Sequence, residues 1–168
     1  MRIIYLSFLL FLINCVVFSQ NEPSCDWNVT VTASNATIAV QQNNSNNMYI
    51  DCYENGSQAT SLMDFLISNL MCPVWIGVFY FDDNWALQCG GYTEWDSTQS
   101  FALAAWGDDP TTPEKDGFSD QEDYIFRLCI NGNEFSLNAS MSSEMPFLDY
   151  YTTNGFADLL DVDFSDWV

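Results

Sequence analysis

Short runs of alternating apolar and polar residues, each closed by a turn signal, constrain the fold of this chain more than any other feature. The runs are rich in β-branched and aromatic side chains and lie at 36–40, 74–81, 101–106, 124–130 and 134–138. Such runs predict strands that are half or fully buried. Asn131-Gly132, between the last two, is a favoured hairpin turn. Strands of this length and spacing predict an all-β fold, a β-sandwich or jelly roll of antiparallel sheets.

The N-terminal half adds three expectations. Residues 27–32 alternate as 36–40 do, and Ser34-Asn35 stands between the two runs, which predicts a hairpin. A third strand is predicted at 48–53. Apolar residues at helical spacing predict one short helix over 61–70.

Residues 1–19 have the pattern of a secretory signal. Arg2 precedes an apolar stretch, and the small residue Ser19 precedes the expected cleavage point. The apolar stretch is shorter than the roughly 20 residues of a membrane-spanning helix, so we expect no membrane insertion. Residues 20–168 then form one domain of ordinary size. We expect secretion or display at the cell surface, with the periplasm as the alternative location.

Charge and the lack of histidine exclude several functions. The chain carries 23 acidic against 3 basic residues and a formal net charge of −20. Such a surface repels nucleic acid and anionic membranes. With no histidine in the chain, histidine-based nucleophile triads are excluded. We therefore expect a non-catalytic protein. A glycosidase that uses a carboxylate pair, Glu94 with Asp96 or Asp82 with Asp83, is the catalytic alternative.

The cysteines that follow the signal are odd in number and contain no Cys-x-x-Cys pair, which argues against a structural zinc site. Exported proteins form disulfides, so up to two bridges are expected. At least one thiol then stays free, pairs with another chain or binds something else. The sequence does not identify the partners among Cys25, Cys52, Cys72, Cys89 and Cys129.

The segment 107–123 holds two prolines, two glycines and seven acidic residues beside a single lysine, which predicts a long loop. Calcium takes about six to eight oxygen ligands, and a glycine allows the sharp turn that brings carboxylates together. The sequence therefore predicts a structural calcium site. The alternative is that these carboxylates cap turns or face solvent. The expected ligands are Asp108, Asp109, Asp116, Asp120 and Glu122.

Aromatic residues offer a second kind of site. Trp85, Tyr92 and Trp95 follow a tight turn predicted at 82–84. Aromatic faces beside polar groups can stack a sugar ring, so these three residues are candidate ligand contacts. The alternative is that they fill the core, as aromatic residues of alternating strands commonly do. The expected partner is a glycan or a surface protein.

Three motifs occur in a fixed order along the chain. They are Ile76-Gly77-Val78-Phe79-Tyr80, Cys89-Gly90-Gly91-Tyr92-x-x-Trp95 and Trp106-Gly107-Asp108-Asp109-x-Thr111-Thr112-Pro113-x-Lys115-Asp116-Gly117-Phe118. Together they resemble a domain that recurs in secreted and cell-surface proteins of Gram-negative bacteria that use type IX secretion. The resemblance implies an extracellular β-sandwich module with no established catalytic role. The chain departs from the pattern by an insertion over 51–71 and by Gln121-Glu122, where Gly-Glu is usual.

Two functional hypotheses follow. The first is a secreted binding or adhesion module with a calcium-bound acidic loop. The second is a purely structural domain that packs within an extracellular assembly.

Overall fold

The computed structural model describes residues 22–41, 74–95, 99–130 and 132–164. Within these ranges the protein is all-β and contains no helix. No segment there forms a helix long and apolar enough to cross a membrane. The predicted signal, the strand at 48–53 and the helix over 61–70 lie outside the described residues. The strands are β1 (Asn35–Val40), β2 (Val74–Phe81), β3 (Leu87–Glu94), β4 (Phe101–Trp106), β5 (Ile125–Ile130), β6 (Asn133–Met141) and β7 (Phe156–Phe164).

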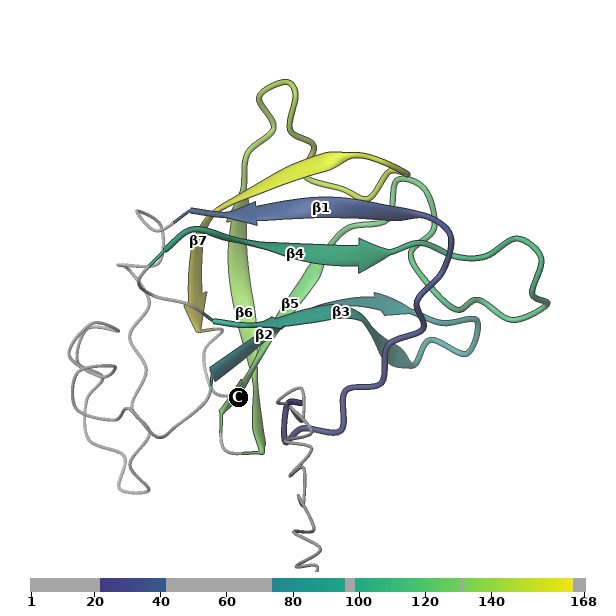
Figure 1. Cartoon of the computed structure of the whole chain (residues 1–168), viewed down its shortest axis with the longest axis horizontal. Coiled ribbons are helices and arrows are strands. Elements are labelled where there is room, and N and C mark those ends of the chain that lie inside the picture. The colour runs from purple at the N-terminus through teal and green to yellow at the C-terminus, as the bar shows by residue number, and fades with distance from the viewer. Residues whose placement is uncertain (1–21, 42–73, 96–98, 131, 165–168) are drawn as a thin grey trace, which may run out of the picture.

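The seven strands form one sheet in the order β3-β2-β5-β6-β7-β1-β4. All neighbours are antiparallel except β1 and β7, which pair in parallel. The sheet curls until its two edge strands, β3 and β4, lie side by side (Figure 1). Gly91 of β3 is so close to the Ala104 carbonyl of β4 that a Cβ at Gly91 would collide with it. The result is a nearly closed barrel.

The all-β prediction is confirmed, but the arrangement differs from two stacked antiparallel sheets. Short alternating strands with turns between them occur in both sandwiches and barrels, so the local pattern does not separate the two. The parallel pairing of β1 with β7 joins segments far apart in the chain, which no local signal reveals. Register shifts at Val78/Phe79 and at Ser140/Met141 mark bulges that help a sheet to curl.

The interior of the barrel is the main core. In β1 the alternate residues Ala36, Ile38 and Val40 are buried and the others are half-buried, as expected for a strand with one inward face. All the other strands except β3 contribute apolar residues to this core, and Trp95, which directly follows β3, also lies in it. Phe118 and Tyr151 belong to it as well, although both come from loops.

A second apolar cluster lies on the outer face of β2, β3 and β5. Residues 27–32 were predicted as a strand, but the structure shows no strand there, so the N-terminal hairpin prediction is wrong. This segment instead places Trp27 against Phe79, with the rings nearly perpendicular at 5.3 Å. Just before this segment, Cys25 forms a disulfide with Cys129 of β5 across a sequence separation of 104.

Cys89 is not part of this disulfide. Cys89 is buried in the outer cluster and carries a free thiol. Burial raises the pKa of this thiol to about 12, so it stays protonated at neutral pH. Cys52 and Cys72 lie outside the described residues.

Candidate functional site at the loop end of the barrel

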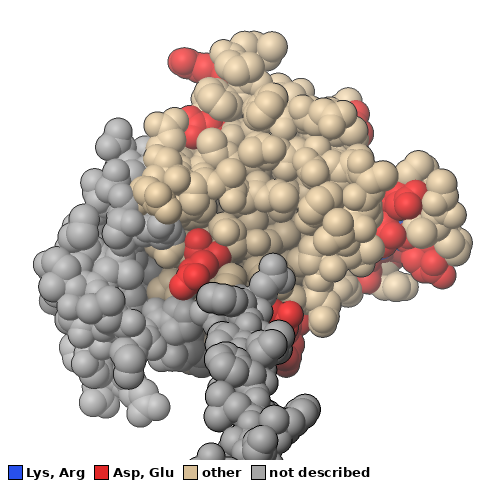
Figure 2. Space-filling model, in the orientation of Figure 1, with Lys and Arg blue, Asp and Glu red and all other residues tan. Residues whose placement is uncertain are grey.

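One end of the barrel carries the long loop after β4, the turn between β2 and β3, and the start of β1 (Figure 1). The predicted acidic ligand residues and Trp85 all belong to this end. In Figure 2, acidic atoms gather on the projecting loop at the right of the molecule, and no lysine or arginine atom shows on that face. The loop end therefore combines the candidate acidic ligands with an exposed aromatic side chain.

The acidic loop is held by bonds between its carboxylates and its own backbone. Asp108 accepts from the Asp116 amide at 2.9 Å, and Asp116 accepts from the Asp109 amide at the same distance. Asp109 in turn accepts from both the amide and the hydroxyl of Thr111, at 2.9 and 2.8 Å. These bonds from Thr111, its amide first, hold the pKa of Asp109 below its usual value. The carboxylates thus fold the loop on itself.

The same loop closes the end of the barrel with an aromatic side chain. Phe118 is 1% exposed and stacks on Tyr151, with ring centroids 5.3 Å apart and planes 14° apart. It also contacts Tyr80 and Tyr124. The Phe118 amide donates to the Trp106 carbonyl at 2.9 Å, which fixes the inserted residue to the end of β4. The predicted long loop is therefore an ordered plug.

Two glycines permit this insertion. A Cβ at Gly117 would collide with the backbone of Gly107, and a Cβ at Gly107 would collide with the Tyr151 hydroxyl. Both positions are closed to any larger residue unless the loop moves. The glycines of the Trp106–Phe118 motif thus have a packing explanation in this fold.

Lys115 holds the acidic loop against the β2–β3 side of the barrel. Its ammonium donates to the Phe81 carbonyl at 2.6 Å and to Glu122 at 2.7 Å, and it lies 5.3 Å from the centre of the Tyr80 ring. Glu122 also accepts from the Ser119 amide at 2.9 Å. Burial raises the pKa of Tyr80 to about 12, and the charge of Asp116 adds to the effect.

The predicted calcium ligands are thereby divided among different partners. Asp108, Asp109 and Asp116 accept bonds from loop amides, and Glu122 pairs with Lys115. Asp120 is exposed at the rim. Within the described ranges, no three acidic or cysteine side chains are grouped in a way that could hold a metal ion. The calcium site stays a prediction.

The β2–β3 turn presents Trp85 to solvent. The indole is 82% exposed and its backbone has φ of 61°, a left-handed conformation that bulky residues rarely adopt. Asp82 fixes the turn by accepting from the amides of Asn84 and Ala86 at 2.8 and 2.9 Å. These bonds, that of Ala86 first, lower the pKa of Asp82. The exposed indole therefore stands on a well-ordered turn.

A groove of about 570 Å³ runs beside this indole. Phe81 lies next to Trp85, with ring centroids 6.1 Å apart and planes 49° apart, so the two rings form an angled apolar wall. The charged lining consists of four carboxylates and one ammonium, from Asp82, Asp83, Glu122, Asp123 and Lys115.

The structure does not bring together the three aromatic residues predicted to contact a ligand. Tyr92 is half-buried against Trp75 and Trp27 on the outer face of the sheet. Trp95 is 5% exposed and packs edge-on against Phe101 inside the barrel. Trp85 alone of the three offers an open face. For Tyr92 and Trp95, the core alternative describes their surroundings better.

Of the carboxylates considered for a glycosidase, Asp82 and Asp83 both accept hydrogen bonds from the protein. Asp82 uses both oxygens in the turn, because its second oxygen accepts from Gln88 at 3.1 Å. Asp83 accepts from the Lys115 amide at 3.0 Å. Asp96, the proposed partner of Glu94, lies outside the described residues.

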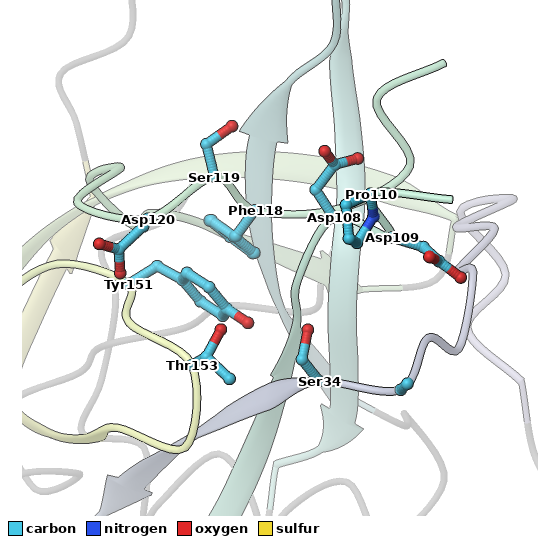
Figure 3. Close-up of a pocket in the computed structure, with 10 residues that line it drawn as sticks. Ser34, Asp108, Asp109, Pro110, Phe118, Ser119, Asp120, Tyr151 and Thr153 are labelled. Atoms are coloured by element: carbon cyan, nitrogen blue, oxygen red, sulfur yellow. The ribbon is translucent and has the colours of Figure 1, made fainter. Parts of the chain in front are cut away.

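Sequence reasoning missed a second pocket at the same end. It has a volume of about 510 Å³ and lies between the start of β1, the acidic loop and residues 151–153. Figure 3 shows hydroxyl groups of Ser34, Tyr151 and Thr153 near one another at its base, with Asp108 and Asp120 on different sides. Isolated serine and threonine residues carry no sequence signal for such a pocket.

In comparisons with protein-family models, curated proteins and solved structures, nothing matches this chain.

Proposed function

We propose that this protein is an exported, non-catalytic binding module that holds a glycan in the groove beside Trp85. The observation that carries the proposal is the exposure of the Trp85 side chain together with its left-handed backbone. A large apolar side chain that is 82% exposed contributes little to the core, and its left-handed backbone costs conformational energy. Residues that are costly to the fold in this way are commonly kept for recognition.

The surroundings of Trp85 suit a sugar ring. The indole and Phe81 supply the apolar wall on which the C–H face of a pyranose stacks. Asp83 and Asp123 line the same groove and can accept hydrogen bonds from sugar hydroxyls. The turn is already fixed by Asp82, so little ordering accompanies binding.

Export is supported by two observations of different kinds. The signal-like residues 1–19 and the resemblance to secreted bacterial modules both favour it. A disulfide such as Cys25–Cys129 persists in oxidising compartments. We propose secretion or surface display. Compartment fractionation of the natural host would reject the proposal if the chain were cytoplasmic.

The binding proposal is tested with a glycan array followed by calorimetry of the glycans that bind. Trp85→Ala should weaken binding about five- to hundredfold, since truncation of a stacked aromatic anchor costs about 1–3 kcal/mol. Phe156→Ala is the matched control, because Phe156 is 56% exposed and does not line the groove. An array without any bound glycan, together with oligomers in solution, would favour the structural packing domain instead.

A second candidate ligand is a lysine- or arginine-bearing segment of a partner protein. Four carboxylates against one ammonium beside two aromatic rings also suit a cation. The two ligands differ in their response to salt, because screening weakens the attraction between exposed charges and leaves ring stacking largely intact. Binding of oligolysine that fades between low and physiological salt, with no glycan bound, would select this candidate.

A further inference from the structure

The pocket beneath Tyr151 has features that the Trp85 groove lacks. The two share no lining residue. The Tyr151 side chain is 1% exposed, and its hydroxyl has no hydrogen-bond partner among the described residues. Leaving a buried hydroxyl unpaired is unfavourable, so such a group calls for an explanation.

The unpaired hydroxyl points into the pocket. Figure 3 shows the phenol oxygen directed between Ser34 and Thr153, below Asp108. Stacking on Phe118 and contact with Gly107 hold the ring in this position. The tyrosine therefore cannot turn its hydroxyl to water without disturbing the plug.

Other polar groups of the pocket can also form further hydrogen bonds. Across the part of the chain that the structure describes, the side chains of Ser34, Ser119, Thr153 and Asp120 make no hydrogen bond with the protein. Asp108 uses one carboxylate oxygen for the Asp116 amide, which leaves its second oxygen available. The pocket thus combines hydroxyls, which donate or accept, with carboxylates, which accept.

We infer that this pocket is a second binding site, for the vicinal hydroxyls of a sugar or another polyol. A ligand must supply donors for Asp108 and Asp120 and a partner for the Tyr151 hydroxyl. Neighbouring hydroxyls of one molecule supply donors and acceptors together. Anionic ligands are repelled by the carboxylates of Asp108, Asp109 and Asp120.

A ligand can reach the Tyr151 hydroxyl only after a small movement of the Ser34 side chain. The Tyr151 oxygen is shielded from solvent, with Ser34 beside it. A serine side chain changes rotamer at little cost, and within the described ranges Ser34 makes no side-chain hydrogen bond that it would give up. The ligand hydroxyl would then take the place beside the phenol.

The site does not depend on the Trp85 proposal and is tested separately from it. Amide chemical shifts of the mature chain are followed during titration with methyl glucoside, methyl mannoside and sorbitol. At least one probe should shift the amides of Asp108, Ser119 and Thr153 in the parent protein. It should shift them equally in Trp85→Ala, which removes the other groove only.

Tyr151→Phe removes the hydroxyl and keeps the ring. Binding at this pocket should weaken about tenfold, the value of one hydrogen bond to a buried group. The melting temperature without ligand should stay level or rise by a few degrees, because an unpaired buried hydroxyl is lost. Tyr150→Phe, a neighbouring tyrosine outside the pocket lining, is the matched control and should bind as the parent does.

Three outcomes would overturn the inference. One is the lack of shifts at these amides with every polyol probe. Another is equal affinity in Tyr151→Phe and the parent. The third is a response of the same amides to calcium alone that Asp120→Asn abolishes, which would make the pocket a cation site. Should Tyr151→Phe fail to fold, Thr153→Val, which removes another hydroxyl from the base of the pocket, provides the same comparison.

Discussion

The acidic loop at 107–124 and the turn at 82–86 lie at the same end of the barrel and use the same chemistry in opposite ways. In both, aspartate carboxylates accept bonds from nearby backbone amides and fix the local chain. The loop then buries its aromatic residue, Phe118, at 1% exposure. The turn exposes its aromatic residue, Trp85, at 82%.

This difference separates a structural role from the binding role proposed for Trp85. An acidic, aromatic sequence is by itself compatible with either one. Phe118 is buried and closes the core, whereas the Trp85 side chain is largely exposed and contacts Phe81. We therefore expect substitution of Phe118 to affect stability and substitution of Trp85 to affect binding.

The largest effect on stability is expected from Phe118→Ala. The side chain fills the barrel end between Tyr80, Tyr124 and Tyr151, so its removal leaves a cavity. Loss of a fully buried phenylalanine costs about 3–5 kcal/mol in the free energy of unfolding. Urea denaturation of the purified chain measures this loss. A cost below about 1 kcal/mol, similar to that of the exposed Phe156→Ala, would show that the plug is not part of the core.

How much of this fold the sequence could predict depends on the range of each interaction. The alternation in 36–40 and the apolar run at 74–81 identified β1 and β2 because inward faces leave a local pattern. Residues 27–32 have the same alternating pattern, yet they form no strand, and Trp27 packs on the outer face of the sheet. Tertiary packing and the Cys25–Cys129 bridge decide that outcome, and neither is visible locally.

The candidate sites were predictable to a smaller extent. The turn that carries Trp85 could be anticipated from Asp82-Asp83-Asn84, but the exposure of each aromatic residue depends on which face of the sheet is covered. Trp95 is an example: it directly follows β3 in the chain, but its side chain lies in the barrel interior. The Tyr151 pocket joins segments from three parts of the chain, so no motif could reveal it.

A smaller loss of stability is expected from Asp116→Ala. The substitution removes the acceptor of the Asp109 amide and leaves a half-buried loop donor without its partner. A cost of about 1–2 kcal/mol follows. Asp120→Ala is the matched control, because the Asp120 carboxylate is exposed at the rim, and it should stay within about 0.5 kcal/mol.

Comparison of the parent with Asp116→Ala also tests the calcium prediction. If the amide bonds alone hold the loop, calcium should leave the melting temperature of parent and Asp116→Ala unchanged. A rise in melting temperature with calcium in the parent, lost in Asp116→Ala, would establish the metal site and revise the comparison between loop and turn.

Acid should weaken both the loop and the turn, by an amount smaller than either substitution in the loop. Asp109 and Asp82 have pKa values below normal because backbone amides bond to their charged forms. A lowered pKa in the folded state stabilises the protein above the unfolded value, near 3.9, and this contribution is lost as pH falls through the folded value. Carboxyl carbon shifts followed by NMR should place both midpoints below 3.9. Midpoints at or above that value would mean that the amide bonds do not form in solution.

The smallest effect on stability is expected from Trp85→Asn, although it removes the whole proposed stacking surface. Asparagine accepts the left-handed backbone of this position more readily than tryptophan does. The free energy of unfolding should therefore stay the same or rise by up to about 1 kcal/mol, while ligand binding is lost. Trp85→Phe, which keeps a ring, should retain part of the binding. If Trp85→Asn instead cost more than about 2 kcal/mol, the exposed indole would be a structural element, and the contrast between a stabilising loop and a binding turn would fail.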